Sequence, residues 1–433
     1  MKQKTSISVK GAVGLGVGSM VGAGVFALMG EAARMAGSAV WAAFLGAGVV
    51  ALLTGYSFVQ LGVRYPSRGG VVEYLVRAYG AGWFSGGSSI LFYIAQLIGM
   101  SMIALAFGTY ASKLIGVSGE SLLIERLLAS GLIIALTWLN LAGSKLVSKA
   151  QSLVVLGNLA LLTLFSLALT RYAEPARLAL DSWPSGTPVV SSLALTFFAF
   201  TGFAVVSNAA EDMKNPARDL PRAMYTSIGI VITLYVTLAL ATTAAVNEKT
   251  LTDSGAMLLI EAARAGFGQV GYTLLLVSAV ISTTTCINGG LYGMTNITYT
   301  LAEKGQLPSR FSMEIRASTR GLTISAALGL IMVNFLTLTT VASLGSATSL
   351  MVYSLVNFGA YRLIRDSRKS RGLILLSVIA CVTAIGVWVM YTLRTSPGSL
   401  WIFLFFLVSA FVAEGLLQRF RQRKILGWSD RDV

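Results

Sequence analysis

The fold of this chain is decided by the stretch GLGVGSMVGAGVF, which spans residues 14–26. It lies in an apolar segment long enough to cross a membrane, and five of its thirteen residues are glycines. Each glycine inside a helix costs about 1 kcal/mol relative to alanine, so a continuous helix is disfavoured. Gly14, Gly18 and Gly22 also lie four residues apart, the small-xxx-small pattern of close helix packing. We therefore expect a membrane helix that is broken near Gly22 to Gly24 and packed closely against its neighbours.

A second interruption is expected in the sixth apolar segment, which contains FAFTGFA at residues 198–204. Five helices separate the two interruptions, and an odd offset reverses the direction in which a helix crosses the membrane. Corresponding broken helices in two inverted halves are the best sequence indication of the central site of a secondary transporter. The pattern therefore predicts a binding site between helices 1 and 6.

Composition places the whole chain in a membrane. Hydrophobic residues make up 55% of the 433 residues, charged residues only 12%, and the mean hydropathy is +0.74. A soluble domain keeps roughly a quarter of its residues charged. We expect an all-α membrane protein within the lipid bilayer, with about twelve transmembrane helices. The predicted ranges are 9–36, 38–63, 82–112, 122–142, 148–170, 190–210, 222–246, 269–302, 321–338, 342–361, 372–393 and 399–418.

The net charge of +15 reflects membrane topology and not nucleic-acid binding. If the amino terminus lies inside, 25 of the 33 lysines and arginines fall in inner segments and 8 in outer ones. This bias is the positive-inside pattern. We therefore expect a multi-pass protein of the cytoplasmic (inner) membrane, with both termini in the cytoplasm and no nucleic-acid partner. The apolar run after Lys10 continues past any plausible cleavage site, which indicates a first helix and not a signal peptide.

The residue types that the chain lacks or rarely uses make several classes of protein unsuitable candidates. The chain has no histidine, and its two cysteines, Cys286 and Cys381, lie far apart in apolar segments. Zinc enzymes, Ser-His-Asp hydrolases and disulfide frameworks are therefore disfavoured. The sequence shows no pair of acids and no nucleophile constellation of the kind that would indicate a membrane enzyme. A channel is the other alternative, but channels usually assemble rings of short subunits, whereas one long chain with two broken helices suits alternating access.

Five motifs along the chain have a known counterpart. They are GSMVGAGVF at 18–26, YPSRGG at 65–70 followed by Glu73 and Tyr74, FFAFTGF at 197–203, EDMKNP at 211–216 and LPRA at 220–223. Together they resemble the amino acid–polyamine–organocation (APC) superfamily, and within it the prokaryotic permeases that are similar to cationic amino acid transporters.

The resemblance implies a five-plus-five inverted repeat with broken helices 1 and 6 and two helices outside it. We place the first repeat at 1–171, the second at 189–363, helices 11 and 12 at 371–420 and a cytoplasmic tail at 421–433. A related class of transporters is joined to a second subunit through a cysteine in an outer loop. Neither cysteine of this chain lies in such a loop, so no obligate subunit is expected.

The broken helix suits an α-amino acid as substrate. Where helix 1 unwinds, the N–H groups of Gly22, Ala23 and Gly24 open a second half-helix, whose positive end is a natural seat for a carboxylate. Carbonyl groups near Val17, Gly18 and Phe198–Thr201 are suited to accept hydrogen bonds from the substrate ammonium. In the family, the same segments hold the amino and carboxyl groups of the substrate. The predicted substrate-binding residues are Val17, Gly18, Ser19, Met20, Gly22, Ala23, Gly24, Phe198, Phe200, Thr201, Gly202 and Ala204.

Helix 6 is expected to set the side-chain preference. Phe198 matches the aromatic residue that closes over substrate in relatives, and Thr201 and Ala204 are expected to face the side-chain pocket. Ordinary packing is the alternative for Phe198 and Phe200. Members that take arginine, lysine or agmatine tend to carry an acid where this chain has Ala204, and an unpaired cation in the bilayer centre is costly. We therefore predict neutral L-amino acids, with cationic amino acids or polyamines as the alternative.

The coupling position departs from the family pattern. Many relatives have a helix-5 lysine whose ammonium takes the place of a sodium ion, and the matching residue here is Asn158, which does not titrate. On helix 8, Thr284 and Thr285 would form, with carbonyl groups near Met20 and Ala23, an oxygen cage suited to sodium. No other cofactor is expected. The alternative is ion-independent exchange, with both threonines hydrogen-bonded to their own helix.

Few ionisable side chains fall in the predicted spans. Glu31 and Arg34 lie three residues apart and are expected to pair near the outer mouth. Glu414 lies near the inner end of helix 12, where its side chain is expected to reach water.

Overall fold

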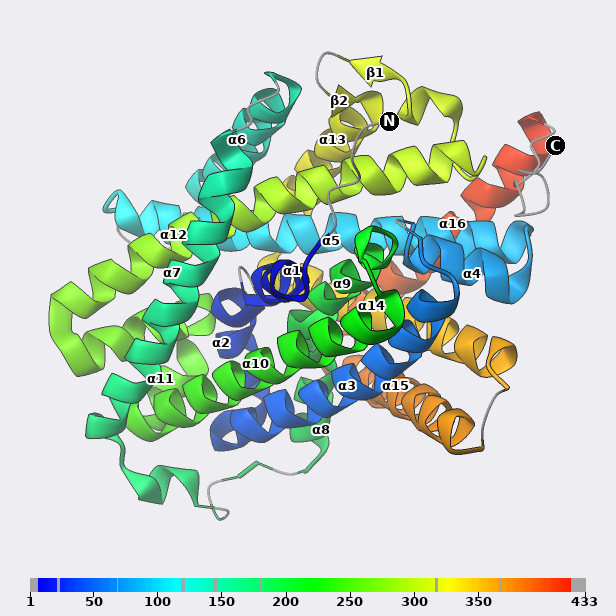
Figure 1. Ribbon diagram of the computed structural model, residues 1–433. Coiled ribbons are helices and arrows are strands. Elements are labelled where there is room, and N and C mark those ends of the chain that lie inside the picture. The colour runs from blue at the N-terminus through cyan, green and yellow to red at the C-terminus, as the bar shows by residue number, and fades with distance from the viewer. Residues whose placement is uncertain are drawn as a thin grey trace.

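The chain is almost entirely helical (Figure 1). This computed structural model describes residues 7–21, 24–67, 69–117, 121–142, 146–179, 181, 183–184, 186–315, 318–365 and 368–421. Within these ranges the only sheet is a two-stranded antiparallel ribbon, in which Glu314 pairs with Thr319.

The elements are given in chain order, with η for 3₁₀ segments. The first half contains α1 (Val9–Val21), α2 (Gly24–Ala36), η1 (Gly37–Ala39), α3 (Val40–Arg64), α4 (Val71–Tyr79), α5 (Trp83–Leu114), α6 (Leu122–Ala142), α7 (Leu146–Leu169), η2 (Thr170–Tyr172) and η3 (Pro175–Leu178). The second half contains α8 (Gly186–Phe197), η5 (Phe198–Phe203), α9 (Ala204–Asn208), η6 (Ala210–Asp212), α10 (Pro216–Ala245), α11 (Glu248–Asp253), η7 (Gly255–Met257), α12 (Leu258–Glu303), η8 (Ser309–Phe311), β1 (Glu314–Ile315), β2 (Ser318–Thr319), α13 (Arg320–Phe335), α14 (Leu338–Leu363), α15 (Arg368–Thr395) and α16 (Pro397–Arg421).

The helices have the length and composition of membrane spans. Among the described residues, ten segments are long and apolar enough to cross a bilayer, and two shorter apolar helices, α1 and α13, add to them. One of the ten, Gly24–Arg64, contains both α2 and α3, which join where Gly37 adopts a positive φ of 52°. Taking α1 with α2 as one crossing gives a count that agrees with the twelve expected helices. The all-helical membrane fold is confirmed, while the inverted repeat and its boundaries remain predictions.

Burial separates central helices from peripheral ones. The spans of α5 and α14 are the most buried inside the protein, whereas those of α16 and α6 are the least. In Figure 1, α5 and α12 cross the molecule side by side, as do α3 and α10, and α1 lies in the middle. The peripheral helices expose large apolar side chains, such as Trp138 on α6 and Trp401 on α16, as helices that face lipid do.

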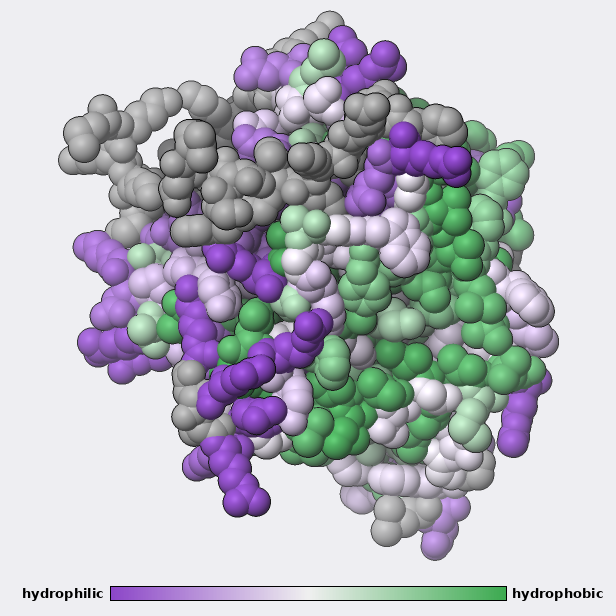
Figure 2. All heavy atoms as spheres, turned by 90° about the vertical axis from the view of Figure 1, so that its right-hand side faces the viewer, coloured by the Kyte–Doolittle hydropathy of each residue, from purple (hydrophilic) through white to green (hydrophobic). Residues whose placement is uncertain are grey.

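One end of the molecule is rich in hydrophilic side chains. This end carries α4 and the last turns of α16, and it faces the viewer in Figure 2, where long hydrophilic side chains project on the left side and at the edges, whereas the right half is largely hydrophobic. Cation–π contacts put Arg362 5.5 Å from the ring centre of Tyr79 and Arg371 4.7 Å from that of Tyr361. We call this face the α4 end.

The predicted helix 269–302 is the longer part of α12. Gly268 interrupts α12 with φ 62° and ψ −150°, a conformation that favours glycine. The ten helical residues before it, Leu258–Phe267, were not anticipated because Gly266 and Gly268 read as helix breakers.

Two expectations about charged residues have different outcomes. Arg34 and Glu31 do pair, with Nη1 and Oε1 3.8 Å apart. The expectation that Glu414 reaches water is wrong, because its side chain is fully buried and accepts a hydrogen bond from Gln418 at 2.9 Å. The cause is tight packing of α16 on α5, since a Cβ built on Gly86 would lie 2.4 Å from the Glu414 carboxyl carbon.

Candidate functional site

The two expected helix interruptions are in contact with each other. Helix α1 ends at Val21 and α2 begins at Gly24, while α8 passes into the 3₁₀ segment η5 where the break at 198–204 was predicted. A Cβ on Gly202 would lie 2.6 Å from the backbone of Ser19, and one on Gly24 would lie 2.9 Å from Cα of Ala199. Both glycines therefore permit backbones to approach where any larger residue would separate them. Gly22 and Ala23, also predicted to bind substrate, lie outside the described residues.

Buried tyrosines donate hydrogen bonds to carbonyl groups at both interruptions. The hydroxyl of Tyr235 on α10 donates to the carbonyl oxygen of Met20 at 2.7 Å, and that of Tyr353 on α14 donates to the carbonyl oxygen of Thr201 at 2.9 Å. Met20 lies in the last turn of α1, where carbonyl groups have no partner within the helix, so Tyr235 supplies a donor there. The Thr201 carbonyl also accepts from the backbone N–H of Ala204, so Tyr353 gives it a second donor. Neither tyrosine was anticipated, because a single tyrosine in an apolar helix has no spacing that marks it.

The two aromatic rings of η5, those of Phe198 and Phe200, pack against different neighbours. The ring of Phe198 is directed towards α5 and α14, since a Cβ on Gly99 or Gly345 would lie 3.2 or 2.8 Å from it. Phe200 is fully buried and packs edge-to-face on Tyr235, with 5.2 Å between ring centres. The ring of Phe200 therefore packs within the protein, which is the alternative stated for it.

Thr201 and Ala204, also predicted to bind substrate, lie in η5 and at the start of α9. The hydroxyl of Thr201 donates to the carbonyl oxygen of Phe198 at 2.8 Å, so it is occupied within its own turn. Ala204 is buried and begins α9. Of the predicted helix-1 residues, Val17 and Met20 are buried, and Gly18 packs on Val155 of α7.

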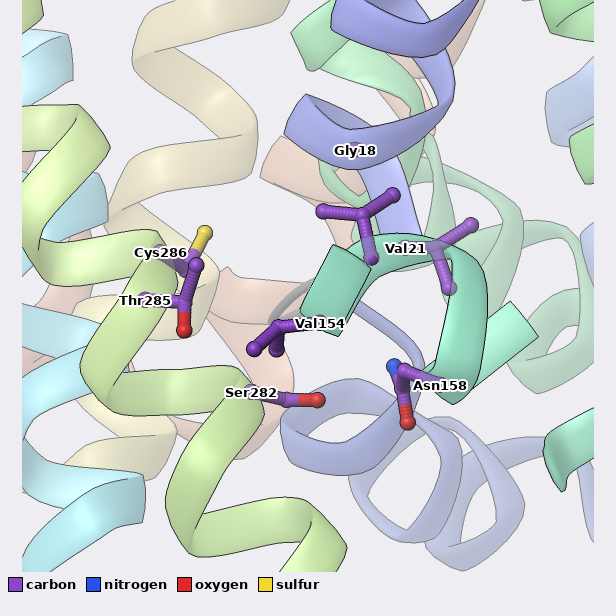
Figure 3. A pocket seen from close by; sticks show the side chains of 8 residues that line it. Gly18, Val21, Val154, Asn158, Ser282, Thr285 and Cys286 are labelled. Atoms are coloured by element: carbon purple, nitrogen blue, oxygen red, sulfur yellow. The ribbon is translucent and has the colours of Figure 1, made fainter. Parts of the chain in front are cut away.

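A small cavity lies between α1, α7 and α12. Its volume is about 20 Å³, enough for roughly one water molecule or one small ion and far too little for an amino acid. In Figure 3 the hydroxyl of Ser282 on α12 points towards Asn158 on α7. The cavity is lined by Gly18, Val21, Val154, Val155, Asn158, Ser282, Thr285 and Cys286.

The cavity brings together only part of the predicted coupling set. Asn158 and Thr285 line it, whereas Thr284 and Met20 do not, and Ala23 lies outside the described residues. Asn158 Oδ1 accepts a hydrogen bond from Ser278 at 2.9 Å. Thr284 and Thr285 donate to carbonyl oxygens one turn earlier in α12, at 2.7 and 2.8 Å, which is the alternative stated for them. Ser282 was missed, although it lies three residues before Thr285 and so on the same helix face.

An ion cluster at the α4 end was also missed. Glu73 of α4 accepts hydrogen bonds from the ammonium group of Lys304, just after α12, and from Nε of Arg77 at 2.9 Å. Glu73 and Lys304 are both buried. Burial alone would raise the pKa of Glu73, but the hydrogen bonds and charges of Lys304 and Arg77 outweigh it and lower the pKa below its ordinary value. The spacing of Glu73 and Arg77 favours a helix pair, but nothing in the sequence links either residue to Lys304.

Two interrupted helices in contact, inside a bundle of apolar spans, define a multi-pass membrane transporter. Comparison with known proteins identifies its family: the chain belongs to the amino acid permease family, whose model matches residues 7–417. This confirms the resemblance to the APC superfamily. The protein is thus an amino acid transporter embedded in the membrane, and not an enzyme.

Relatives cover most of the chain. It is 32% identical over 404 residues to the inner membrane transport protein YbaT of Escherichia coli (strain K12), which covers 93% of this chain and 94% of YbaT. It is 26% identical over 339 residues to the serine/threonine exchanger SteT of Bacillus subtilis (strain 168), covering 76% of each protein. The branched-chain amino acid permease BcaP of the same species is 26% identical over 320 residues, or 69% of this chain and 67% of BcaP.

Removing the hydroxyl of Tyr353 tests whether the interruption in helix 6 depends on its hydrogen bond. In Tyr353→Phe the Thr201 carbonyl keeps the N–H of Ala204 but loses its second donor, which costs about 0.5–1.5 kcal/mol, so we expect a lower melting temperature and slower amino acid uptake. The matched control is Tyr93→Phe, which breaks a 2.7 Å bond to Ser325. It should lower the melting temperature similarly while uptake is retained, and equal loss of uptake in both variants would contradict a specific role for Tyr353.

Proposed function

We propose that this protein carries neutral L-amino acids across the cytoplasmic membrane by alternating access, with both of its termini in the cytoplasm. The observation that supports this most is the contact between the two interruptions, where Gly202 meets Ser19 and Gly24 meets Ala199. A substrate placed there has the N-terminus of α2 for its carboxylate and the carbonyl groups at the end of α1 and in η5 for its ammonium. On this proposal the substrate-binding residues are those predicted above in helices 1 and 6.

The preference for neutral side chains rests on what η5 and α9 lack. Residues 198–204 include no acid, and Ala204 stands where relatives that carry cations tend to have one. A cationic side chain at this depth would have no compensating charge from this segment, which is costly in a low-dielectric environment. The names of SteT and BcaP refer to serine, threonine and branched-chain amino acids, which are all neutral.

Sodium coupling is proposed for the cavity between α1, α7 and α12. Its size suits one small ion, and Asn158, Ser282 and Thr285 supply the oxygen atoms that a hard cation prefers. Ion-independent exchange is the second candidate, because the Thr285 hydroxyl already donates to Ile281 and because SteT is named an exchanger. Under both proposals Asn158 carries no proton.

Uptake into proteoliposomes separates these possibilities. We expect labelled neutral amino acids to enter, and arginine and putrescine to enter at least about tenfold more slowly, since an unpaired cation at a helix centre costs about 2.5–3.5 kcal/mol. Faster uptake of arginine or putrescine than of any neutral amino acid would overturn the specificity.

The same vesicles distinguish the two coupling modes. Sodium-dependent accumulation in empty vesicles, lost in Ser282→Ala and Thr285→Val but kept in the control Thr284→Val, would support the cation site. Uptake that occurs only into preloaded vesicles, whatever the cation, would identify an exchanger and assign the threonines a structural role.

A further inference from the structure

The ring of Phe198 reaches across from helix 6 (α8, η5 and α9) to two other helices. A Cβ built on Gly345 of α14 would lie 2.8 Å from Cζ of this ring and 3.1 Å from both Cε atoms, and one built on Gly99 of α5 would lie 3.2 Å from Cζ. Cζ is the ring atom farthest from the backbone, so the tip of the ring occupies the space that a side chain at either glycine would need. We call Gly99 and Gly345 the glycine notch.

The helix that carries Gly345 is bonded to helix 6 on both sides of this contact. Ser346 of α14 donates a hydrogen bond to the carbonyl oxygen of Ala194 in the last turn of α8, and Tyr353 donates to that of Thr201 in η5. Moving α14 away from helix 6 would therefore break at least one of these bonds. A methyl group added at Gly345 would instead displace the ring.

The ring shares its face of helix 6 with the residues proposed to contact the side chain of the substrate. Because η5 is a 3₁₀ helix, in which side chains three residues apart eclipse one another, Phe198 and Thr201 lie on one face. Ala204 follows three residues later, directly after η5. The position of the ring therefore limits the room at one end of this face.

We propose that the glycine notch determines which neutral side chains the transporter accepts, by holding the ring of Phe198 clear of the substrate. Gly99 and Gly345 are positioning residues, because they act through the ring and not on the substrate directly. With the ring seated in the notch, a large apolar side chain such as that of leucine fits. With the ring pushed out, large substrates lose affinity and small ones such as alanine keep it. This inference rests on the function proposed above.

The KM values for uptake of labelled leucine and alanine into proteoliposomes test the proposal. One methylene group in an apolar pocket changes binding by about 10–200-fold, so we expect Gly345→Ala to raise the KM of leucine about tenfold and that of alanine less than about threefold. The matched control is Gly359→Ala on the same helix, whose Cβ would lie 2.6 Å from Cβ of Ala78 and not near the ring. It should lower the melting temperature similarly and leave the ratio of the two KM values unchanged.

Shortening the side chain of Phe198 tests whether the effect passes through its ring. In a Phe198→Leu background no Cζ reaches the notch, so adding Gly345→Ala should change neither KM further. A change that persists in this background would contradict the proposal, because the methyl group would then act on the substrate or on helix packing. Gly99→Ala makes a milder contact, 3.2 Å from one ring atom, and should shift the KM of leucine in the same direction by less. This second variant keeps the test decisive if Gly345→Ala does not fold.

The outcomes separate this inference from the function on which it rests. If the wild type takes up leucine and alanine but both Gly345→Ala and Gly99→Ala keep the wild-type ratio of KM values, the notch does not determine specificity and the proposed function is unaffected. A wild type that takes up neither amino acid would overturn the proposed function, and this inference with it.

Discussion

Glu73→Gln is expected to lower the stability of the protein more than any other single change of charge at the α4 end. The substitution removes a carboxylate that Lys304 and Arg77 both contact, and the buried Lys304 ammonium loses this partner. Removing one partner of a buried ion pair costs about 3–5 kcal/mol. The Glu73–Lys304 pair joins α4 to the end of α12, so we also expect the α4 end to open when the pair is lost. Uptake should then fall by about tenfold or more. Melting temperature and uptake measure the two effects.

The loss of stability in each variant should depend on how many buried charges the substitution leaves unpaired. Lys304→Gln leaves the Glu73–Arg77 contact intact and is expected to cost less than Glu73→Gln. Glu73→Gln combined with Lys304→Gln removes both buried charges and should recover part of the lost stability. The control is Glu261→Gln, whose partner Arg264 is largely exposed, with an expected cost of at most about 1 kcal/mol. If the double variant is as unstable as the sum of the single ones, the pair is not coupled.

The reactivity of Cys286 measures whether the small cavity becomes accessible to solvent in Glu73→Gln. It lines the small cavity between α1, α7 and α12, and the other cysteine, Cys381, is buried in contact with Thr54. In a Cys381→Ser background, we expect maleimide to react faster with Cys286 when Glu73 is replaced by glutamine. An unchanged rate would separate the loss of stability from any opening.

The pH dependence of this contribution follows from the lowered pKa of Glu73. In the folded protein the pKa lies below its ordinary value of 4.5, so the stabilising charge is present above that value and is lost as the pH falls through the folded-state pKa. The stability difference between the wild type and Glu73→Gln should therefore be constant between about pH 6 and pH 8 and narrow below about pH 4. A difference that changes near neutral pH would show that another group titrates with the cluster.

The parts of the fold that sequence could predict are those with a local cause. Glycines within residues 14–26 weaken a helix wherever they occur, and α1 ends at Val21, inside that stretch. The break at 198–204 likewise appears as η5 within one residue of the expected end. The predicted spans follow from apolar length alone, which is also a local property.

The parts that sequence could not predict depend on contacts between distant segments. Lys304 lies 231 residues after Glu73, and no periodicity joins them. Thr285 and Ser282 share one face of α12, whereas Thr284 lies about 100° away, and only the packing of α12 on α1 and α7 decides which face borders the cavity. Glu414 is a similar case, since its burial depends on the small residue Gly86 across the α5–α16 contact.

Gly202→Ala is expected to abolish most transport while the protein still folds. The added methyl group would lie 2.6 and 2.7 Å from the backbone carbon and oxygen of Ser19, and backbone atoms cannot rotate out of its way as a side chain can. The two interrupted helices must therefore separate. Overpacking of this kind costs about 1–3 kcal/mol, and if the cost falls on the substrate-bound state, uptake should drop by about tenfold or more.

The high helix propensity of alanine lets this test distinguish a tight contact at Gly202 from a position with free space. Within a helical segment alanine is favoured over glycine by about 1 kcal/mol, so without a tight contact Gly202→Ala would stabilise the protein. Gly14→Ala supplies that control, because a Cβ on Gly14 would meet no atom within 4 Å and should leave uptake at the wild-type rate or improve stability slightly. A Gly202→Ala protein that transports as well as Gly14→Ala would mean that close approach of helices 1 and 6 is not required. If Gly202→Ala instead transports poorly and binds substrate weakly while its stability is nearly normal, the substrate binds at this contact. The added methyl group would then destabilise the substrate-bound protein more than the empty one.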